Sequence, residues 1–565
     1  MLDYQSHLAG LNVTINNLKN LIQSGSNNTP ELEQVDKIIN ENFSYAFLGS
    51  IVDRLLEHDG ASDIEVERLT KASDIWKMVK GYIIEVEKLR NTFESLVENP
   101  DQPGIMNKYN DLYNKLKNDL TSQYNMLVAK LQAFKDEISD LKHVTQHGQA
   151  TDTPVINWTW RDIILSRRTG KFASNVLEVA KQNGDSKAIS FAYGVLSSYA
   201  SNVAGSAYIN QTVGGPRRSH PHRDRLASYT MGAWFKENRS DLTTSINDII
   251  AKLSFGSPNA PNLPLEINDL LMESLYRTYG NIKDFPDLNQ SYQKLIKHLN
   301  LLSSFTPIPL PKPINDNTWQ TMVGTLDPKD LNDNPNSGYN PSPSSSNWVD
   351  DVPWWAWVLF GVCIALVAAC YFIGICAPAE KDPFRGPFQN TDETKQFLTS
   401  DNALKGVKVL FDLHCQLYET ANISLKTLKL IGMIYPDSSD LVEPQFAQFT
   451  TIPRTEEQNF PKRQISNKDY YIAFPNSADE NPNADISIYA AAANPNVFLE
   501  GSTSSVNEYG LSLWVAATLG QPSELNRINY NLDADRGYKH ECWQVDSGSI
   551  LDNPVLVKIL GYDSM

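Results

Sequence analysis

The feature that most constrains this chain is an apolar segment of 28 residues, Val352 to Ala379, that carries no charge. Roughly 20 apolar residues are enough to cross a bilayer as a helix. Charged residues flank the segment on both sides, and tryptophans gather at its start, as they do where a helix meets the membrane interface. We therefore predict a single transmembrane helix over residues 350–379. The alternative is a buried core helix of a large soluble domain.

Small residues recur every four positions inside this segment, at Gly361, Ala365 and Ala369. Such a row lets a second helix approach closely, so the predicted partners are membrane lipid and a protein partner or second copy on this face. Basic residues follow the segment, which places the C-terminal part in the cytoplasm. The first 21 residues lack the pattern of a secretory signal. The part of the chain before the segment would then have to cross the membrane without such a signal. Either the charge rule fails here or the segment inserts after synthesis.

The charge balance and the cysteine content exclude several classes of protein. The 565 residues include 49 Lys and Arg against 66 Asp and Glu, a net charge of -17. An acidic chain is a poor partner for nucleic acid, because phosphate binding needs a cationic face. Five cysteines, none before Cys363, are too few for a disulfide framework. The chain also lacks the phosphate-loop, HExxH and GxSxG signatures of common enzymes.

The N-terminal part has the periodicity of helices. Thr29 and Pro30 form a helix start, with Thr29 as the N-cap. Two heptad seams predict an antiparallel helical hairpin over 72–145, joined at Pro103-Gly104. The first seam comprises Ile75, Val79, Tyr82, Val86, Leu89, Phe93 and Leu96, and the second comprises Tyr124, Leu127, Leu131, Phe134, Ile138 and Leu141.

The whole chain is predicted to be mainly α, a helical bundle followed by the membrane helix and a mixed, irregular C-terminal region. A helical domain spans 1–304, and residues 305–349 form a linker rich in Pro, Ser and Asn that cannot pack a core. After the membrane segment, residues 380–402 form a polar bridge within the C-terminal region 380–565. A helix over 404–430 then gives way to loops and short strands.

The densest polar cluster follows Gly214-Gly215-Pro216 and holds four arginines and two histidines within nine residues. Arginine forks match phosphate geometry, and histidines add donors or bind metal. The candidate phosphate-binding residues are Arg217, Arg218, His220, His222, Arg223 and Arg225. The alternative is a solvated loop whose arginines pair with nearby carboxylates.

Two stretches, NWTWRDIILSRRTGKFASNVLEVA at 157–180 and FAYGVLSSYASNVAGSAYINQTVGGPRRSHPHRDRLASYTMGAW at 191–234, resemble the helical core of zinc-dependent phospholipase C-like proteins. The match includes Arg167-Arg168-Thr169, the Val-Gly-Gly-Pro turn and an opening helix at Tyr45-Ala46-Phe47-Leu48-Gly49. It covers residues 40 to 300. The resemblance implies a helical scaffold built around a zinc centre.

The metal ligands that the resemblance implies are replaced in this chain. The family's His-Asp-His set, spaced by four on one helix face, falls at Ser198, Asn202 and Ser206. Its later histidine and glutamate fall at Asp224 and Ser228. Asp53 and Asp224 with His220 or His222 supply at most a partial set, so we expect no zinc cofactor. The pair Asp533 and Asp535 is either a calcium loop or a plain turn.

Three functions remain open from the sequence. The first is a catalytically degenerate phospholipase C-like membrane protein, a pseudoenzyme that acts by lipid or partner binding or by assembly. The second is a membrane-inserting toxin or injected effector, whose hairpin and apolar segment rearrange to enter a bilayer. The third is an active metal-dependent phosphoester hydrolase with an unorthodox ligand set. We prefer the first.

Overall fold

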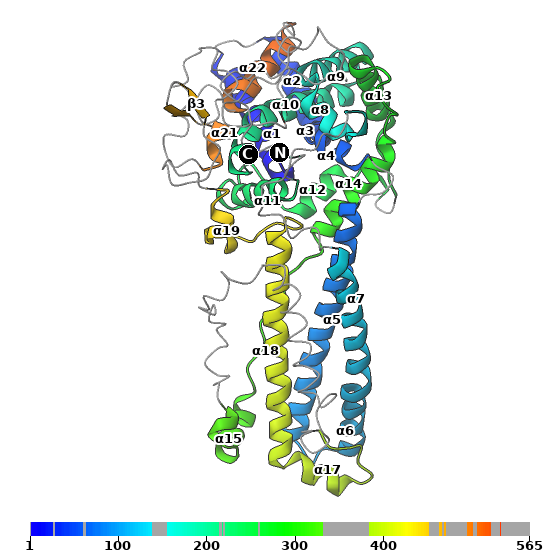
Figure 1. Cartoon of the computed structure of the whole chain (residues 1–565), viewed down its shortest axis with the longest axis vertical. Coiled ribbons are helices and arrows are strands. Elements are labelled where there is room, and N and C mark those ends of the chain that lie inside the picture. The colour runs from blue at the N-terminus through cyan, green and yellow to red at the C-terminus, as the bar shows by residue number, and fades with distance from the viewer. Residues whose placement is uncertain are drawn as a thin grey trace. The chain divides into compact units, whose positions relative to one another are not determined.

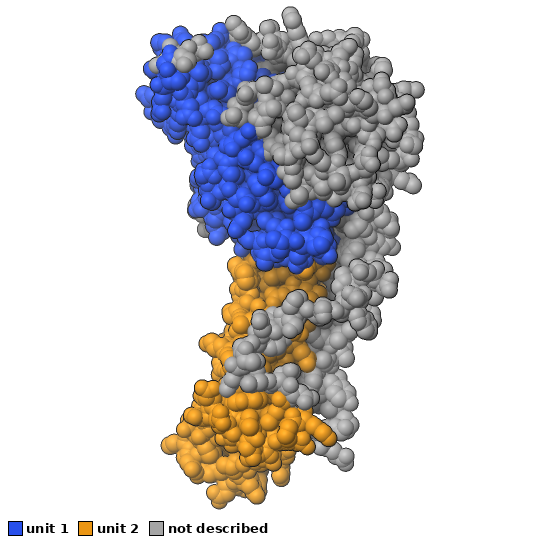
Figure 2. All heavy atoms as spheres, turned by 90° about the vertical axis from the view of Figure 1, so that its left-hand side faces the viewer, with its two compact units in different colours: residues 1–66, 143–303, 429–565 blue, residues 67–142, 304–428 orange. Residues whose placement is uncertain are grey.

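The computed structural model describes residues 2–25, 29–59, 64–137, 155–213, 217, 221–257, 260–331, 384–450, 463–465, 468–470, 494–500, 506–520 and 532. The described chain is mainly helical, as predicted (Figure 1). It divides into two compact units (Figure 2), unit 1 with residues 1–66, 143–303 and 429–565, and unit 2 with residues 67–142 and 304–428. The helical domain predicted over 1–304 is therefore divided between them.

Unit 1 is built from helices of the N-terminal, central and C-terminal parts of the chain. Its main helices and strands are α1 (Tyr4–Ser24), α2 (Pro30–Glu41), α3 (Phe43–Ser50), α4 (Val52–Leu55), η1 (Leu56–His58), η4 (Val155–Asn157), α8 (Trp160–Ser166), α9 (Thr169–Asn183), α10 (Ser186–Val213), α11 (Pro221–Asn238), α12 (Ile246–Leu253), β1 (Gly256–Ser257), β2 (Ala260–Pro261), α13 (Leu265–Tyr279), α14 (Leu288–Leu302), η9 (Asp440–Val442), α19 (Pro444–Ala447), β3 (Arg463–Ile465), β4 (Lys468–Tyr470), α21 (Asn496–Glu500) and α22 (Val506–Thr518). The two short sheets are antiparallel pairs, β1 with β2 and β3 with β4.

The centre of unit 1 is α10, which contacts α1, α3, α9, α11 and α22. Small residues along α10 allow these helices to come close. At its contact with α3 the backbones nearly touch, because Gly194 faces the carbonyl of Ala46 and Gly49 faces that of Phe191. The start of α2 agrees with the prediction from the sequence, since the Thr29 side chain caps the helix and Pro30 is its first residue.

The C-terminal region contributes a helix to the core of unit 1, contrary to the prediction of loops and short strands. Trp514 of α22 is fully buried, and its Nε1 donates to the carbonyl oxygen of Tyr193 at 3.1 Å. The hydroxyls of Tyr193 and Thr518 are 2.8 Å apart. The prediction failed because it weighed the Asn, Pro and Ser content of 435–565 above the apolar run around Trp514.

Unit 2 contains the predicted helical hairpin. Its elements are α5 (Ile64–Glu98, of which the first turn belongs to unit 1), α6 (Ile105–Asn114), the π-helical turn η2 (Lys115–Asp119), α7 (Leu120–Glu137), α15 (Asp316–Thr325), η5 (Pro328–Leu331), α17 (Thr391–Leu398) and α18 (Asp401–Leu430, of which the last two residues belong to unit 1). Gly104, at φ 71°, turns the chain from α5 into α6. The helix predicted over 404–430 is α18. Residues 138–145 of the predicted hairpin lie outside the described part.

Two segments of unit 2 pack where the sequence predicted a linker and a polar bridge. Within 305–349, the described residues bury Ile308, Ile314, Trp319 and Met322. Within 380–402, a helix forms as α17, and Phe384, Phe388 and Phe397 are buried. Both predictions relied on average polarity, whereas a few apolar side chains at the right spacing are enough to bury one face of a segment.

The predicted membrane helix, 350–379, lies outside the described residues, as do Gly361, Ala365 and Ala369. Within the ranges that the structure does describe, no helix combines the length and the apolar character that a bilayer crossing requires.

Candidate functional site

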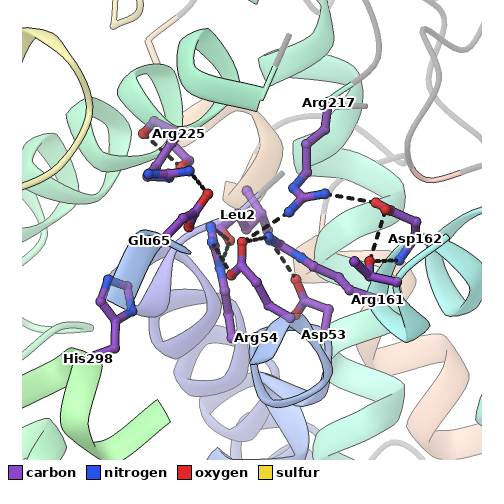
Figure 3. Close-up of polar contacts among 12 residues, drawn as sticks. Leu2, Asp53, Arg54, Glu65, Arg161, Asp162, Arg217, Arg225 and His298 are labelled. Atoms are coloured by element: carbon purple, nitrogen blue, oxygen red, sulfur yellow. Dashed lines mark hydrogen bonds and ion pairs between the residues drawn. The ribbon is translucent and has the colours of Figure 1, made fainter. Parts of the chain in front are cut away.

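A buried network of charged side chains lies in unit 1, at the ends of several short helices (Figure 3). Asp53 and Arg54 belong to α4, and Glu57 to η1. Arg161 and Asp162 come from the first turns of α8. Arg217, from the segment between α10 and α11, reaches the same place. The network therefore joins residues more than 150 positions apart.

Glu57 is the centre of the network, because its carboxylate contacts three guanidinium groups. Arg54 Nη1 is 3.0 Å from Glu57 Oε2, Arg217 Nη2 is 3.1 Å from Oε1, and Arg161 Nη1 also contacts Oε1. Burial alone would raise the pKa of Glu57, but Arg161, Arg54 and Arg217 together hold it well below its usual range. Glu57 is therefore ionised at neutral pH.

Asp53 is the second buried carboxylate. His7 Nε2 of α1 is 3.1 Å from Asp53 Oδ1, and Arg161 Nη2 is 3.3 Å from Oδ2. Burial would raise the pKa of Asp53, but His7 and the two arginines lower it below the ordinary value. Asp53 Oδ2 thus accepts from Arg161, and Oδ1 lies within ion-pair distance of His7.

Local structure fixes the remaining members. The Thr159 side chain caps α8 by accepting from Asp162 N at 3.1 Å, and its hydroxyl donates to Asp162 Oδ2 at 2.9 Å. The other oxygen, Asp162 Oδ1, accepts from Arg217 Nη1 at 2.8 Å. Arg54 Nε donates to the Leu2 carbonyl at 2.9 Å, which ties the start of α1 to the network.

A second buried cluster surrounds His298 of α14. Tyr4 Oη is 3.0 Å from His298 Nδ1, and Tyr229 Oη is 3.4 Å from Nε2. Tyr229 stacks on Tyr435 with ring centroids 4.3 Å apart. Tyr435 in turn donates to Asp3 Oδ2 at 2.7 Å, and Asp3 caps α1. The cluster links three segments of unit 1 through paired polar groups.

We expect Tyr435→Phe to lower the free energy of unfolding by about 1.5–3 kcal/mol, because the buried Asp3 carboxylate loses one charged hydrogen bond. Tyr276→Phe is the matched control, since Tyr276 is 54% exposed and its change should be near zero. Urea unfolding of both variants measures the difference. Equal effects at the two positions would contradict the role given to the Tyr435 hydroxyl.

The predicted degenerate positions on α10 are buried and share one face of the helix. Ser198 is 3%, Asn202 1% and Ser206 0% exposed, and Ser206 Oγ is 3.4 Å from Asn202 Oδ1. Asp224 and Ser228 are buried one turn apart on α11, where the Ser228 hydroxyl donates to the Arg225 carbonyl at 3.0 Å.

Three of the predicted phosphate-binding arginines, Arg217, Arg223 and Arg225, are placed among groups of unit 1. Arg217 joins the Glu57 network, and Arg225 pairs with Glu65. Arg223 Nε donates to the Val213 carbonyl at 3.1 Å, and its guanidinium lies over the Phe449 ring. His222 is half-buried at the start of α11, while Arg218 and His220 lie outside the described residues. Arg217 and Arg225 thus pair with carboxylates of unit 1, whereas Arg223 contacts a backbone carbonyl and an aromatic ring.

The residues of the network do not fit a zinc centre. Among the described residues, no group of three or more His, Cys, Asp or Glu side chains is placed to hold a metal ion. Asp53 contacts a histidine and an arginine, and the α10 positions offer hydroxyl and amide groups, which are poor zinc ligands. The suggested calcium pair, Asp533 and Asp535, lies outside the described residues.

Most of the network was missed by sequence reasoning, which named Asp53 and Arg217 but not Glu57, Arg161, Asp162 or His7. One signal was available, because Asp53-Arg54 and Arg161-Asp162 are opposite charges within otherwise apolar helical stretches. Charges in such positions are paired when they are buried.

Comparisons of the chain with models of protein families, with curated proteins and with solved structures found no match.

Proposed function

We propose that this chain is a catalytically degenerate member of the zinc-dependent phospholipase C-like scaffold, and that it acts at a membrane by binding lipid or a protein partner. The motifs at 157–180 and 191–234 carry the resemblance. The observation that supports the loss of catalysis is the way in which the buried carboxylates of unit 1 are neutralised.

Three carboxylates, of Asp53, Glu57 and Asp162, face three guanidinium groups, of Arg54, Arg161 and Arg217. Their formal charges sum to zero before His7 is counted. A divalent cation added to this network would meet three fixed positive charges, and no excess of carboxylate would offset their repulsion. A hydrolytic metal centre needs about three good protein ligands and an open position.

The experiment that tests the loss of catalysis measures metal content and phosphodiesterase turnover on the full-length protein purified without chelators. We expect less than stoichiometric zinc and no turnover above a heat-inactivated control. Stoichiometric zinc together with turnover would overturn the proposal and favour an active hydrolase.

The assignment of the old ligand positions has its own test. We expect the triple variant Ser198→His, Asn202→Asp, Ser206→His to bind zinc, because two histidines and an aspartate would then share one helix face. The control Lys77→His, Gly81→Asp, Glu85→His places the same set on α5, where Lys77 and Gly81 are exposed. Dialysis against zinc followed by elemental analysis compares the two variants. The control measures the zinc that such a set binds on one helix face alone. A folded triple variant that binds no more zinc than this control or than wild type would show that the α10 positions are wrongly assigned.

A further inference from the structure

One segment of unit 2 is held as a peptide would be held by a receptor. Residues 306–313 read TPIPLPKP, with proline at every second position. Each proline fixes φ near -65°, and the residue before each proline is driven to extended or polyproline-II backbone. Figure 1 shows the segment before α15 as a coil without helix or strand. Its sequence therefore fixes an extended conformation before it packs.

Burial along this segment repeats every three residues. Ile308, Pro311 and Ile314 are buried, whereas the positions between them are exposed, including Leu310 at 49%. A polyproline-II helix has three residues per turn, so one face of it carries every third side chain. Period three is neither the helical nor the strand period, and it marks one face of a polyproline-II helix against the protein.

The receptor face is a second seam of α5, distinct from the apolar seam predicted from the sequence. Its residues lie three, four or ten positions apart, which is the spacing of one helix face. Those that contact residues 304–318 are Ser73, Trp76, Lys80, Arg90, Glu94 and Glu98. Most are polar. Polar side chains suit this role because an extended segment outside any sheet has backbone N–H and C=O groups that need partners.

Side chains of this seam bind the backbone of the segment in register. Trp76 Nε1 donates to the Thr306 carbonyl at 3.3 Å. Arg90 Nη1 donates to the Lys312 carbonyl, and Glu94 Oε1 accepts from Asn315 N. The Arg90 guanidinium also lies 5.6 Å from the centre of the Phe411 ring. These hydrogen bonds recognise the backbone of the segment, while the side chains of Ile308, Pro311 and Ile314 form its buried apolar face.

The lengths of the two partners match. From Trp76 to Glu94, α5 rises about 27 Å at 1.5 Å per residue. Nine polyproline-II steps from Thr306 to Asn315 cover about 28 Å. Helix α5 and the extended segment therefore stay in register between Trp76 and Glu94.

We infer that this seam of α5 is a binding site for a polyproline-II peptide of the pattern Ile-x-x-Pro-x-x-Ile, and that residues 304–315 are its resident ligand. Aromatic and polar side chains that hydrogen-bond the backbone are how proteins recognise preformed polyproline-II segments. The inference does not depend on the proposed function. A segment tethered in cis has a high effective concentration, so wild-type protein keeps its site filled.

The test uses the full chain with residues 305–315 replaced by a Gly-Ser sequence of equal length, and a second full-length variant, Ile308→Asp with Ile314→Asp. The probe is a fluorescent peptide of residues 303–319, followed by anisotropy. We expect either variant to bind the peptide at least tenfold more tightly than wild type does. A control peptide that carries the same two aspartates should bind none of the three proteins.

The receptor side is tested by adding Arg90→Gln and Glu94→Gln to the Gly-Ser variant, which should reduce peptide binding at least tenfold. Circular dichroism and gel filtration compare the fold of all variants with wild type. The inference is overturned by a folded Gly-Ser variant that does not bind the 303–319 peptide, or that binds this peptide and the aspartate control peptide equally. Failure of both released variants to fold also overturns it, because the segment would then be part of the core and not a replaceable ligand.

Discussion

Replacing Glu57 by glutamine is expected to lower the free energy of unfolding by about 3–5 kcal/mol, because it leaves buried guanidinium groups without their shared counter-charge. Glutamine has nearly the shape of glutamate, so the cavity and packing terms stay small. Arg54 and Arg161 are 3% and 1% exposed, and water cannot replace the lost carboxylate at either group. The cost comes from breaking the network and is not the net stabilisation that the intact network provides.

The matched control is Glu266→Gln, which removes the same charge from a surface pair. Glu266 Oε1 is 3.2 Å from Lys187 Nζ, and the two side chains are 29% and 47% exposed. Exposed pairs of this kind contribute about 0–1 kcal/mol. Urea unfolding followed by tryptophan fluorescence compares both variants with wild type. If Glu57→Gln lowered the free energy of unfolding no more than Glu266→Gln does, the network would be solvated.

The pH dependence of the same variant gives an independent readout. The pKa of Glu57 is lower in the folded chain than in the unfolded chain, where a glutamate titrates near ~4.3. Its contribution to stability is therefore complete above that value, and it is lost as the pH falls through the lowered folded pKa. We expect the stability of wild type to fall more steeply below pH ~4.3 than that of Glu57→Gln.

The sequence predicts the helices of this chain better than it predicts their partners. Thr29-Pro30 and the seam from Ile75 to Leu96 are local signals, and local signals fix helix starts and apolar faces. The second seam of α5 escaped prediction because Ser73, Arg90 and Glu94 look like a solvated face. Only the structure shows that a segment more than 200 residues away covers that face.

The candidate site shows the same limit. Asp53 was singled out from the sequence, but its partners His7 and Arg161 lie 46 and 108 positions away. Ion pairs have no periodicity and no fixed spacing along the chain, so a single sequence cannot pair Glu57 with Arg161 or Arg217. The α10 positions were named through the resemblance alone, and their shared face follows from a spacing of four on a helix.

The second large effect is expected at the contact between α3 and α10. A Cβ atom at Gly194 would lie 2.0 Å from the Ala46 carbonyl oxygen, and one at Gly49 would lie 2.1 Å from that of Phe191. Both obstacles are backbone atoms of helices, which cannot rotate away as a side chain does. Gly194→Ala should therefore push the helices apart and lower the free energy of unfolding by about 2–3 kcal/mol or more, despite the higher helix propensity of alanine.

A glycine-to-alanine substitution should have the opposite effect on the free energy of unfolding where no other element packs against the glycine. Beyond the adjacent residues and the backbone of α5 itself, no atom lies within 4 Å of a Cβ added at Gly81, so Gly81→Ala should stabilise the chain by about 0.5–1 kcal/mol through helix propensity alone. Gly49→Ala with Gly194→Ala tests the mechanism further. One separation of α3 from α10 relieves both clashes, so the double variant should lose clearly less than the sum of the two single losses. Strict additivity in urea unfolding would contradict a shared displacement and would point to two independent local rearrangements.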